Sequence, residues 1–463
     1  MSHEFHEMTG IDRVHFVGIG GAGMSGIAEI LLDYDLEVSG SDQAESDNTR
    51  RLQDKGARVH IGHDPSLVAG MDLVVKSSAV ADDNVEILAA KDRGIPVIRR
   101  AEMLAELMRV KYGIAVAGTH GKTTTTSLVG TVLTHAGLDP TVIVGGRLRV
   151  TGTGARYGRS RYLVVEADEY DRSFLRLSPV LAVVTNIEVD HLDTYENLDD
   201  IVQAFERFAG RVPFFGQVIA CLDDRNVQGL LPRLADRRIL TYGFSPQADL
   251  VAVDVRLEEG RTRFGVRRNG SLLGEVSLPL PGRHNVQNAL ATLGVATALG
   301  LELPQVAAGL ETFKGVHRRF ERLGVFRGSA VIDDYAHHPT EVAATLAAAR
   351  EIAPAARIHA VFQPHLYSRT REHAEEFGRA LLGADTAWVT PIYGSRERPI
   401  PGVSSELVTD AARRAGHRRV RQGEWDEVVA GLAATVEAGD VVLTLGAGDI
   451  YRLGVRLVAE EEP

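Results

Sequence analysis

Short apolar runs that end in glycine or polar residues alternate with longer amphipathic segments along the 463-residue chain. Runs of the first kind predict buried strands, and the amphipathic segments predict helices. Strands that alternate with helices favour α/β layers with mostly parallel sheets. Because the chain is too long for one compact core, we expect several α/β domains.

The pattern divides into three blocks, which we interpret as domains over residues 1–110, 111–316 and 317–463. The first opens with the strand RVHFVGIG, the second with the strand YGIAVAG, and the third with the segment HRRFERLG. Residues 249–280 differ, because alternating segments separated by EEG and RNG predict an antiparallel meander. In the third block, the helix after AHHP is expected to begin at Pro339, a favoured first-turn position.

The segment VAGTHGKTTTTSLVG, residues 116–130, joins a predicted strand to a predicted helix that ends at Gly137. It resembles the phosphate-binding pattern G-x-x-x-x-G-K-[ST], although Val116 stands where the first glycine belongs. A helix N-terminus with Lys122 beside it attracts phosphate, and the Thr123 hydroxyl is placed to ligate Mg²⁺. We therefore predict a nucleotide phosphate site; a chance Gly-Lys-Thr turn is the alternative.

The first block carries a second glycine turn, with Gly18, Gly20 and Gly23 in a G-x-G-x-x-G pattern between a strand and a helix. Asp42 ends the next strand, where dinucleotide-binding enzymes place a ribose-binding acid. This arrangement favours NAD when it is considered alone, yet any nucleotide diphosphate satisfies the glycine pattern. A purely structural tight turn is the remaining interpretation.

Polar residues follow two apolar strands of the second block. Glu166 and Asp168 come after one strand, and Asn186, Asp190 and His191 after the next. Ligands in open α/β sheets bind beyond the carboxyl ends of strands, so these groups are expected beside the phosphate loop. Carboxylates and a neutral imidazole can hold Mg²⁺ near phosphates, and solvated loop acids are the alternative.

Weaker signals lie further along the chain. His284 and Asn288 stand four apart on one predicted helical face and can contact an adenine edge, or else cap the helix. The segments HRRFE, IDDYAHHP and FQPHLYSRTRE bring charged and aromatic residues directly after strands, His365 and Arg369 among them. Surface charge explains any one of these residues, whereas the cluster suggests a site.

Composition narrows the function classes. The net charge of −11 at pH 7, from 51 basic and 62 acidic residues, argues against non-specific nucleic-acid binding. Cys221 is the single cysteine of the sequence, so no disulfide framework or multi-cysteine metal site is possible within the chain. The N-terminus has no signal-peptide pattern, and no apolar run reaches membrane-spanning length. We expect a soluble cytoplasmic protein that needs no membrane partner.

Nine motifs in order carry a resemblance to the Mur ligase family: HFVGIGGAGMSGIAE, SGSD, GTHGKTTT, EADEYDRSFL, TNIEVDHLDTY, GRHNVQNALA, HRRFE, DDYAHHPTE and FQPHLYSRT. They span nearly the whole chain and look most like the alanine-adding member. The resemblance implies a Rossmann-like first domain for the UDP-sugar. It also implies a central domain of phosphate-loop type for ATP, with a small antiparallel sheet, and a Rossmann-like third domain for the amino acid.

The implied reaction is ATP-dependent amide formation between L-alanine and the lactyl carboxylate of UDP-N-acetylmuramate, through an acyl phosphate. It serves peptidoglycan precursor synthesis and requires Mg²⁺, with two ions expected. The third domain is implied to close over ATP. A monomer or a homodimer is expected.

The resemblance also assigns residues to roles. Those implied in catalysis are Lys122, Asn186, His191 and Arg319. Those implied to bind ATP are Gly118, Thr119, His120, Gly121, Lys122, Thr123, Thr124, His284, Asn288, Arg319 and Asp334. Those implied to bind the UDP-sugar are Gly18, Gly20, Gly21, Ala22, Gly23, Asp42, Ser77 and Ser78. Those implied to line the amino-acid and acyl pocket are Tyr335, His337, His365 and Arg369, and the metal ligands are Thr123, Glu166 and His191.

Several alternatives remain at this point. Tyr170 stands where several relatives have serine, which alters the site geometry if the ring points inward. EADEYDRSFL and YAHHP also resemble a recycling ligase that attaches a preformed tripeptide to UDP-N-acetylmuramate, although SFLRLSP is more typical of the alanine-adding enzyme. An NAD-dependent dehydrogenase and a non-catalytic ATP-dependent switch are the rivals from other classes.

Overall fold

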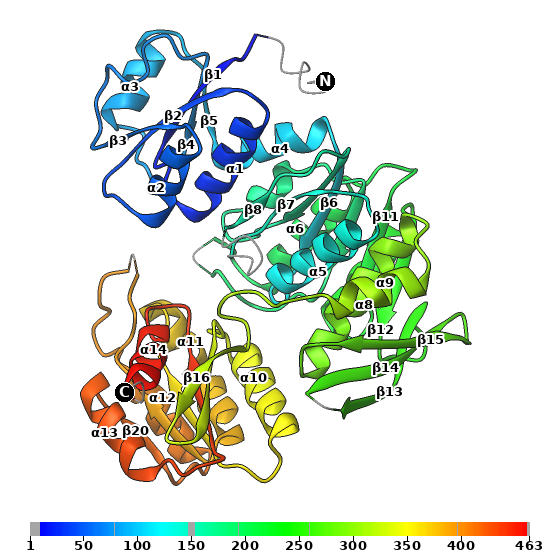
Figure 1. Ribbon diagram of the computed structural model, residues 1–463, viewed down its shortest axis with the longest axis vertical. Helices are drawn as coiled ribbons and strands as arrows, with labels where there is room; N and C mark the ends of the chain where they lie inside the picture. The colour runs from blue at the N-terminus through cyan, green and yellow to red at the C-terminus, as the bar shows by residue number, and fades with distance from the viewer. Residues whose placement is uncertain are drawn as a thin grey trace. The chain divides into compact units, whose positions relative to one another are not determined.

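The computed structural model describes residues 10–77, 79–146, 153–192, 194–258, 260–395 and 397–460 (Figure 1). The chain forms two compact units. The first contains residues 1–254, 264–276 and 287–314, and the second contains 255–263, 277–286 and 315–463. Among the helices of the described ranges, none combines the length and apolar character needed to cross a membrane.

The N-terminal sheet has five parallel strands in the order β3-β2-β1-β4-β5. Its elements are β1 (Arg13–Val17), α1 (Ala22–Asp33), β2 (Glu37–Asp42), α2 (Asp47–Asp54), β3 (Arg58–Ile61), β4 (Leu73–Lys76), α3 (Val85–Asp92), β5 (Val97–Arg99) and α4 (Arg100–Arg109). The strand order reverses between β1 and β4, and ligands of open α/β sheets bind at such a point. Gly18 follows β1 and Ser77 follows β4, so the predicted diphosphate site lies at the reversal.

The central sheet has ten strands in the order β15-β14-β13-β12-β11-β10-β6-β9-β7-β8. Its strands are β6 (Tyr112–Ala117), β7 (Thr141–Ile143), β8 (Ala155–Arg156), β9 (Tyr162–Glu166), β10 (Leu181–Val184), β11 (Gln217–Cys221), β12 (Ile239–Gly243), β13 (Leu250–Glu258), β14 (Arg261–Arg268) and β15 (Ser271–Leu278). The helical elements are α5 (Lys122–His135), η1 (Ser173–Arg176), α6 (Leu198–Ala209), α7 (Arg225–Leu230), η2 (Leu231–Leu234), α8 (Arg283–Ala298) and α9 (Leu303–Glu311). Because β9 and β10 flank β6 in parallel, their carboxyl ends lie beside the phosphate loop, as predicted.

The meander predicted over residues 249–280 is confirmed as β13, β14 and β15. β14 and β15 are joined by Asn269 and Gly270 alone, which is the connection of an antiparallel hairpin. Both residues have positive φ, 48° and 82°, as a type I′ turn requires. The meander continues the central sheet, because β13 pairs in parallel with β12.

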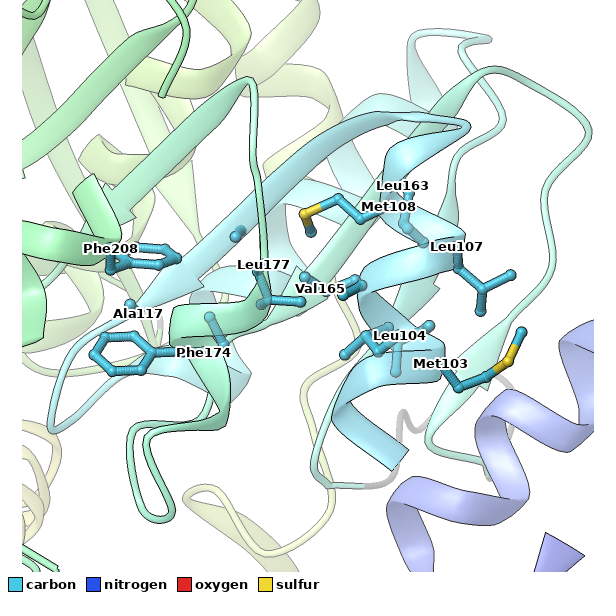
Figure 2. Close-up of a cluster of buried hydrophobic side chains, with 14 of the residues drawn as sticks. Met103, Leu104, Leu107, Met108, Ala117, Leu163, Val165, Phe174, Leu177 and Phe208 are labelled. Carbon is cyan, nitrogen blue, oxygen red and sulfur yellow. The ribbon is translucent and has the colours of Figure 1, made fainter. Parts of the chain in front are cut away.

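The N-terminal sheet, its helices and the central sheet share one hydrophobic core. Figure 2 shows Leu104, Leu107 and Met108 of α4 beside Leu163 and other apolar side chains of the central domain. All of these side chains are at most 4% exposed. Burying a side chain of this size contributes roughly 2 kcal/mol, so α4 is held firmly on the central sheet.

The C-terminal sheet has six strands in the order β16-β17-β21-β18-β19-β20. Its elements are β16 (Glu321–Phe326), β17 (Ser329–Asp334), α10 (Pro339–Ile352), β18 (Ile358–Phe362), α11 (Tyr367–Ala380), η3 (Leu381–Gly383), β19 (Thr386–Val389), α12 (Glu406–Arg414), β20 (Val420–Gln422), α13 (Trp425–Thr435), β21 (Val441–Leu445) and α14 (Tyr451–Ala459). Five strands are parallel, and the edge strand β16 is antiparallel to β17. The start of α10 at Pro339 is confirmed, whereas the sequence pattern did not reveal β16.

Candidate active site

The phosphate loop between β6 and α5 requires glycine at two positions. Gly118 has φ of 142°, and a Cβ there would lie 1.9 Å from Oγ1 of Thr185. Gly121 has φ of 80°, and its Cβ would lie 2.6 Å from Oδ1 of Asn288. Real Cβ atoms never approach other atoms so closely. A side chain at either position is therefore excluded by the neighbours of the loop as well as by backbone strain.

Residues after β10 hold the loop in place. Asn186 brackets His120: its Oδ1 accepts the His120 N–H at 2.8 Å, and its Nδ2 donates to the His120 carbonyl at 3.1 Å. The Thr185 hydroxyl donates to the same carbonyl at 2.6 Å, and Thr119 Oγ1 accepts the N–H of Glu188 at 2.8 Å. The structure therefore places Asn186, Thr119 and His120 together, with the Asn186 amide bonded to the loop backbone.

Lys122 begins α5 and is surrounded by acceptors. Its Nζ donates to the Gly118 carbonyl at 2.7 Å, to the Thr119 carbonyl at 3.2 Å and to Oε1 of Glu169 at 2.8 Å. Burial disfavours the ammonium, but the Glu169 and Asp168 carboxylates outweigh that effect and raise the pKa of Lys122. The side chain is thus a fixed positive charge at the helix N-terminus.

Thr123 and Glu166 meet beside Lys122, as the sequence predicts. The Thr123 hydroxyl donates to Oε1 of Glu166 at 3.0 Å, and the Gly145 N–H donates to Oε2 at 2.6 Å. The hydroxyl and the carboxylate present the oxygen ligands that Mg²⁺ prefers. Thr124, the next residue of α5, is 8% exposed and lies in the first turn of the helix.

Glu169 is a central member of the site that the sequence reasoning did not assign. It is 3% exposed, and its Oε2 has no hydrogen-bond partner among the described residues. Burial raises the pKa of Glu169 to about 7, and the Asp168 carboxylate adds to the shift while Lys122 opposes it. The unsatisfied buried oxygen of Glu169, whose other carboxylate oxygen contacts Lys122, fits a bound cation near the phosphate loop. The three acids of EADE are the signal in the sequence, but β9 ends at Glu166, so strand alternation does not place Glu169.

His191 lies near the same oxygen of Glu169 that accepts from Lys122. Its Nε2 is 3.8 Å from Glu169 Oε1 and 3.6 Å from Oδ2 of Asp190. The residue has φ of 56°, a left-handed backbone that directs the ring from the loop after β10. The ring of Tyr170 packs edge-on against that of His191, with centroids 5.0 Å apart, although Tyr170 is 38% exposed. Tyr170 is therefore a neighbour of the predicted metal ligand.

The first glycine loop lies at the ends of β1 and β2. The N–H groups of Gly18 and Ile19 donate to the Ser41 carbonyl at 2.8 and 3.0 Å, and the Gly20 N–H donates to Oδ2 of Asp42 at 2.8 Å. A Cβ on Gly20 would lie 3.0 Å from that carboxylate. Asp42, predicted as a ribose-binding acid, thus holds the loop itself.

The other predicted members of this site also gather at the end of the sheet. A Cβ on Gly18 would lie 3.1 Å from the Cβ of Ser77, so the two loops are in contact. Gly21 donates its N–H to the Gly18 carbonyl at 3.3 Å, and Ala22 begins α1. A Cβ on Gly23 would lie 3.0 Å from Nη1 of Arg100, a residue the sequence reasoning did not assign. Ser78 lies outside the described residues.

Asn288 and His284 occupy different environments on α8. Oδ1 of Asn288 accepts the Thr125 hydroxyl at 3.1 Å, in the middle of the helix, so Asn288 is not a helix cap. In the second unit, burial lowers the pKa of His284 to about 4, which keeps the imidazole neutral at pH 7.

The second unit groups several predicted residues around the end of β17. Asp334 accepts the N–H groups of Phe320 and Ala336 at 2.7 and 2.8 Å, and burial raises its pKa to about 6. The guanidinium of Arg319 lies 5.1 Å from the ring centroid of Tyr335 and 3.6 Å from Oε1 of Glu341. Arg319, Tyr335 and Asp334 are therefore brought together, as the motifs implied.

The predicted amino-acid pocket is an aromatic cluster. The His337 ring lies 5.3 Å from the Tyr335 ring and 5.9 Å from the His365 ring. Nδ1 of His365 lies 3.4 Å from Nη1 of Arg369, and the Tyr393 ring stacks on His365 at 5.9 Å. Tyr393 is a member of this cluster that the sequence did not indicate, because it enters from a loop after β19.

The chain has two glycine loops. One follows the first strand of a Rossmann-like sheet, and the other, with Gly-Lys-Thr, precedes α5. Together they define an α/β nucleotide-binding protein. The family models agree with this class and cover most of the chain. Residues 13–112 match the model of the Mur ligase family catalytic domain, 116–296 the Mur ligase middle domain, and 318–448 the Mur ligase glutamate ligase domain.

Individual relatives are similar over nearly the whole length. The chain is 51% identical to the UDP-N-acetylmuramate–L-alanine ligase of Geotalea daltonii, covering 97% of this chain and 98% of the relative. A solved structure of UDP-N-acetylmuramate–alanine ligase from Thermotoga maritima is 32% identical, with a TM-score of 0.80, and covers 97% of this chain and 98% of that one. A murein peptide ligase from Psychrobacter arcticus shares the fold at 24% identity, with a TM-score of 0.70, covering 96% and 98%. The chain belongs to the Mur ligase family.

Proposed function

We propose that this enzyme joins L-alanine to the lactyl carboxylate of UDP-N-acetylmuramate with cleavage of ATP to ADP and phosphate, in peptidoglycan precursor synthesis. The observation that carries the proposal is the convergence of Lys122, Thr123 and Glu166 at the N-terminus of α5. The chain that contains these residues is 51% identical to a relative named UDP-N-acetylmuramate–L-alanine ligase. The relatives give no support to a dehydrogenase.

The reaction has two steps whose atoms balance. A lactyl carboxylate oxygen attacks the γ-phosphorus of ATP, and the bond to the bridging oxygen breaks, which gives an acyl phosphate and ADP. The amine of L-alanine then attacks the acyl carbon, and inorganic phosphate leaves as the amide forms. The difficulty of the first step is the repulsion between a carboxylate and a polyanion, so catalysis depends on positioning and on neutralising charge.

The phosphate loop supplies the neutralising groups. Lys122 is assigned to the phosphates of ATP together with the backbone of residues 118–121, and Thr124 lies in the same helical turn. Thr123 and Glu166 are assigned to one Mg²⁺, and His191 to a second ion. Magnesium, when bound, withdraws negative charge from the phosphate oxygens. Glu169 fixes the Lys122 ammonium in position through the 2.8 Å contact.

Asn186 acts on the same loop. Because its amide forms two hydrogen bonds with the backbone of His120, it keeps the loop open for the triphosphate. The Asn288 contact with Thr125 supports α5 in the same way, in addition to its assigned adenine contact. These supports hold the backbone of the loop in one conformation, which reduces the entropy cost of binding phosphate.

The remaining assignments follow the motifs. Gly18 to Gly23, Asp42, Ser77 and Ser78 are assigned to the UDP-sugar. Arg319 is assigned to the γ-phosphate, Asp334 to the ribose, and His284, which is neutral at pH 7, to adenine. Tyr335, His337, His365 and Arg369 are assigned to L-alanine and the acyl group.

The proposal is tested with the purified chain, ATP, Mg²⁺ and UDP-N-acetylmuramate, to which L-alanine or L-Ala-γ-D-Glu-meso-diaminopimelate is added in parallel. We expect phosphate release to depend on L-alanine, with a product whose mass equals the two substrates less one water. Preference for the tripeptide would assign the chain to the recycling reaction instead. Phosphate release that ignores both acceptors and the UDP-sugar would indicate a nucleotide switch.

A further inference from the structure

The glycine loop of the N-terminal sheet lacks a cation of its own. Residues 18–23 read G-I-G-G-A-G, and the Asp42 carboxylate accepts the Gly20 N–H, so the local side-chain charge is negative. The second loop differs, because Lys122 stands within it. A diphosphate bound by backbone N–H groups next to Asp42 needs a positive charge from another element.

Arg100 is placed to supply that charge. It is the first residue of α4, and its Nη1 and Cζ would lie 3.0 and 3.3 Å from a Cβ on Gly23. Gly23 is in the first turn of α1, where helix N–H groups lack intrahelical acceptors. The guanidinium and the N-terminus of α1 therefore face the same point in space.

The Arg100 guanidinium has no hydrogen bond or ion pair with any other residue that the structure describes. Other basic side chains around the loop are paired: Arg51 donates to Glu29 at 2.6 Å, and Lys76 forms an ion pair with Asp82. Arg100 also lines a small cavity with Glu166 and Asp168 of the central domain. A half-buried guanidinium with five donors is costly to leave unpaired.

We propose that Arg100 binds the diphosphate of the UDP-sugar and positions that substrate between the two glycine loops. The inference rests on the proposed function. A guanidinium can take two phosphate oxygens in a bidentate arrangement, which fixes the direction in which the sugar leaves the diphosphate. Because α4 is packed on the central sheet, the same contact sets the distance from the diphosphate to the phosphate loop.

The test compares Arg100→Ala, Arg100→Lys and the matched control Arg99→Ala, which removes an exposed charge one residue away. For Arg100→Ala we expect the KM for UDP-N-acetylmuramate to rise about 10- to 100-fold, with the KM for ATP unchanged. Arg100→Lys retains the charge but loses the fork of donors, so we expect an intermediate rise. The control should match the wild type.

Calorimetry with UDP and with UMP distinguishes a contact with the diphosphate from a purely structural role of Arg100. A structural role would not change the affinity for one of these nucleotides alone. We expect Arg100→Ala to weaken UDP binding and to leave UMP binding nearly unchanged. Equal losses for both nucleotides, an unchanged KM for the UDP-sugar, or a fall in kcat alone would overturn the inference. If the wild type forms no amide at all, the proposed function fails first, and that outcome is visible before any variant is made.

Discussion

The sequence predicts the role of Lys122, but it does not predict the residue that pairs with its side chain. The Gly-Lys-Thr pattern predicts a cation at the helix N-terminus, and the structure adds the buried carboxylate of Glu169 at 2.8 Å. The pair makes the lysine a preorganised group, because its position is fixed before any phosphate is bound.

Lys122→Ala should lower turnover at least about 1000-fold, because it removes the only side-chain cation of the loop. Binding of the UDP-sugar should persist, since that ligand is assigned to the N-terminal sheet. Turnover is measured by phosphate release and binding by calorimetry. Arg99→Ala is the matched control, and loss of UDP-sugar binding in the Lys122 variant would contradict the assignment of the two loops.

Some of the predicted residues that the structure brings together stand at or directly after the ends of strands, where sequence order reveals spatial neighbours. Glu166 and Asn186 belong to this class, because β9 and β10 flank β6. Glu169 and Arg100 could not be found in the same way. Glu169 lies beyond the end of β9, and Arg100 reaches Gly23 only because α4 packs across two domains.

At the scale of elements, the phosphate loop depends on its neighbours as much as on its own glycines. A Cβ placed on Gly118 would lie 1.9 Å from the hydroxyl oxygen of Thr185, the residue after β10. The end of β10 therefore limits the shape of the loop. The missing first glycine of the usual pattern is Val116, a fully buried residue of β6. The strand thus occupies a position that a longer loop would use.

Gly118→Ala should therefore destabilise the fold by about 3 kcal/mol or more and abolish ATP binding, because the methyl group overlaps Thr185. Gly137→Ala is the control: Gly137 also has positive φ, 78°, but its Cβ would meet nothing within 4 Å. That change should cost only about 1 kcal/mol. Urea unfolding measures both values, and equal losses would show that backbone strain alone explains the glycine.

Periodicity predicts elements well where each strand carries its own apolar run. The parallel strands and the hairpin turn at Asn269 and Gly270 are of this kind. β16 was missed because its residues, ERLGVF, are exposed or partly buried except for Phe326 and show no clear alternation. An edge strand of this type is specified by its ladder with β17, which involves residues outside the local sequence.

At the scale of the whole molecule, the C-terminal unit contains a buried polar cluster that links its stability to pH. Burial alone would raise the pKa of Asp440, but hydrogen bonds from the Glu437 N–H, Arg357 and His359 outweigh it and lower the pKa to about 2. A carboxyl group whose pKa falls on folding stabilises the fold above its unfolded pKa. That contribution is lost as the pH falls through the folded pKa.

Asp440→Asn should therefore reduce the free energy of unfolding by about 2 kcal/mol at neutral pH. The difference from wild type should narrow below about pH 4, where the carboxyl group of the unfolded wild-type chain becomes protonated. Urea unfolding from pH 7 to pH 3 measures it. Asp426→Asn, at an exposed ion pair with Arg456, is the control and should show no comparable pH-dependent gap. A constant gap across this range would contradict the assigned pKa.

The packing of α4 has a consequence for the autonomy of the chain's first 110 residues. Their apolar interior is continuous with that of the central sheet, in a single cluster that runs from Val14 to Leu234. A fragment that ends at about residue 110 would expose Leu104, Leu107 and Met108 to water as an aggregation-prone apolar surface. The two glycine loops are thus carried on domains that share one apolar core, and we expect exchange of the first domain between relatives to require exchange of the central-domain surface that receives α4.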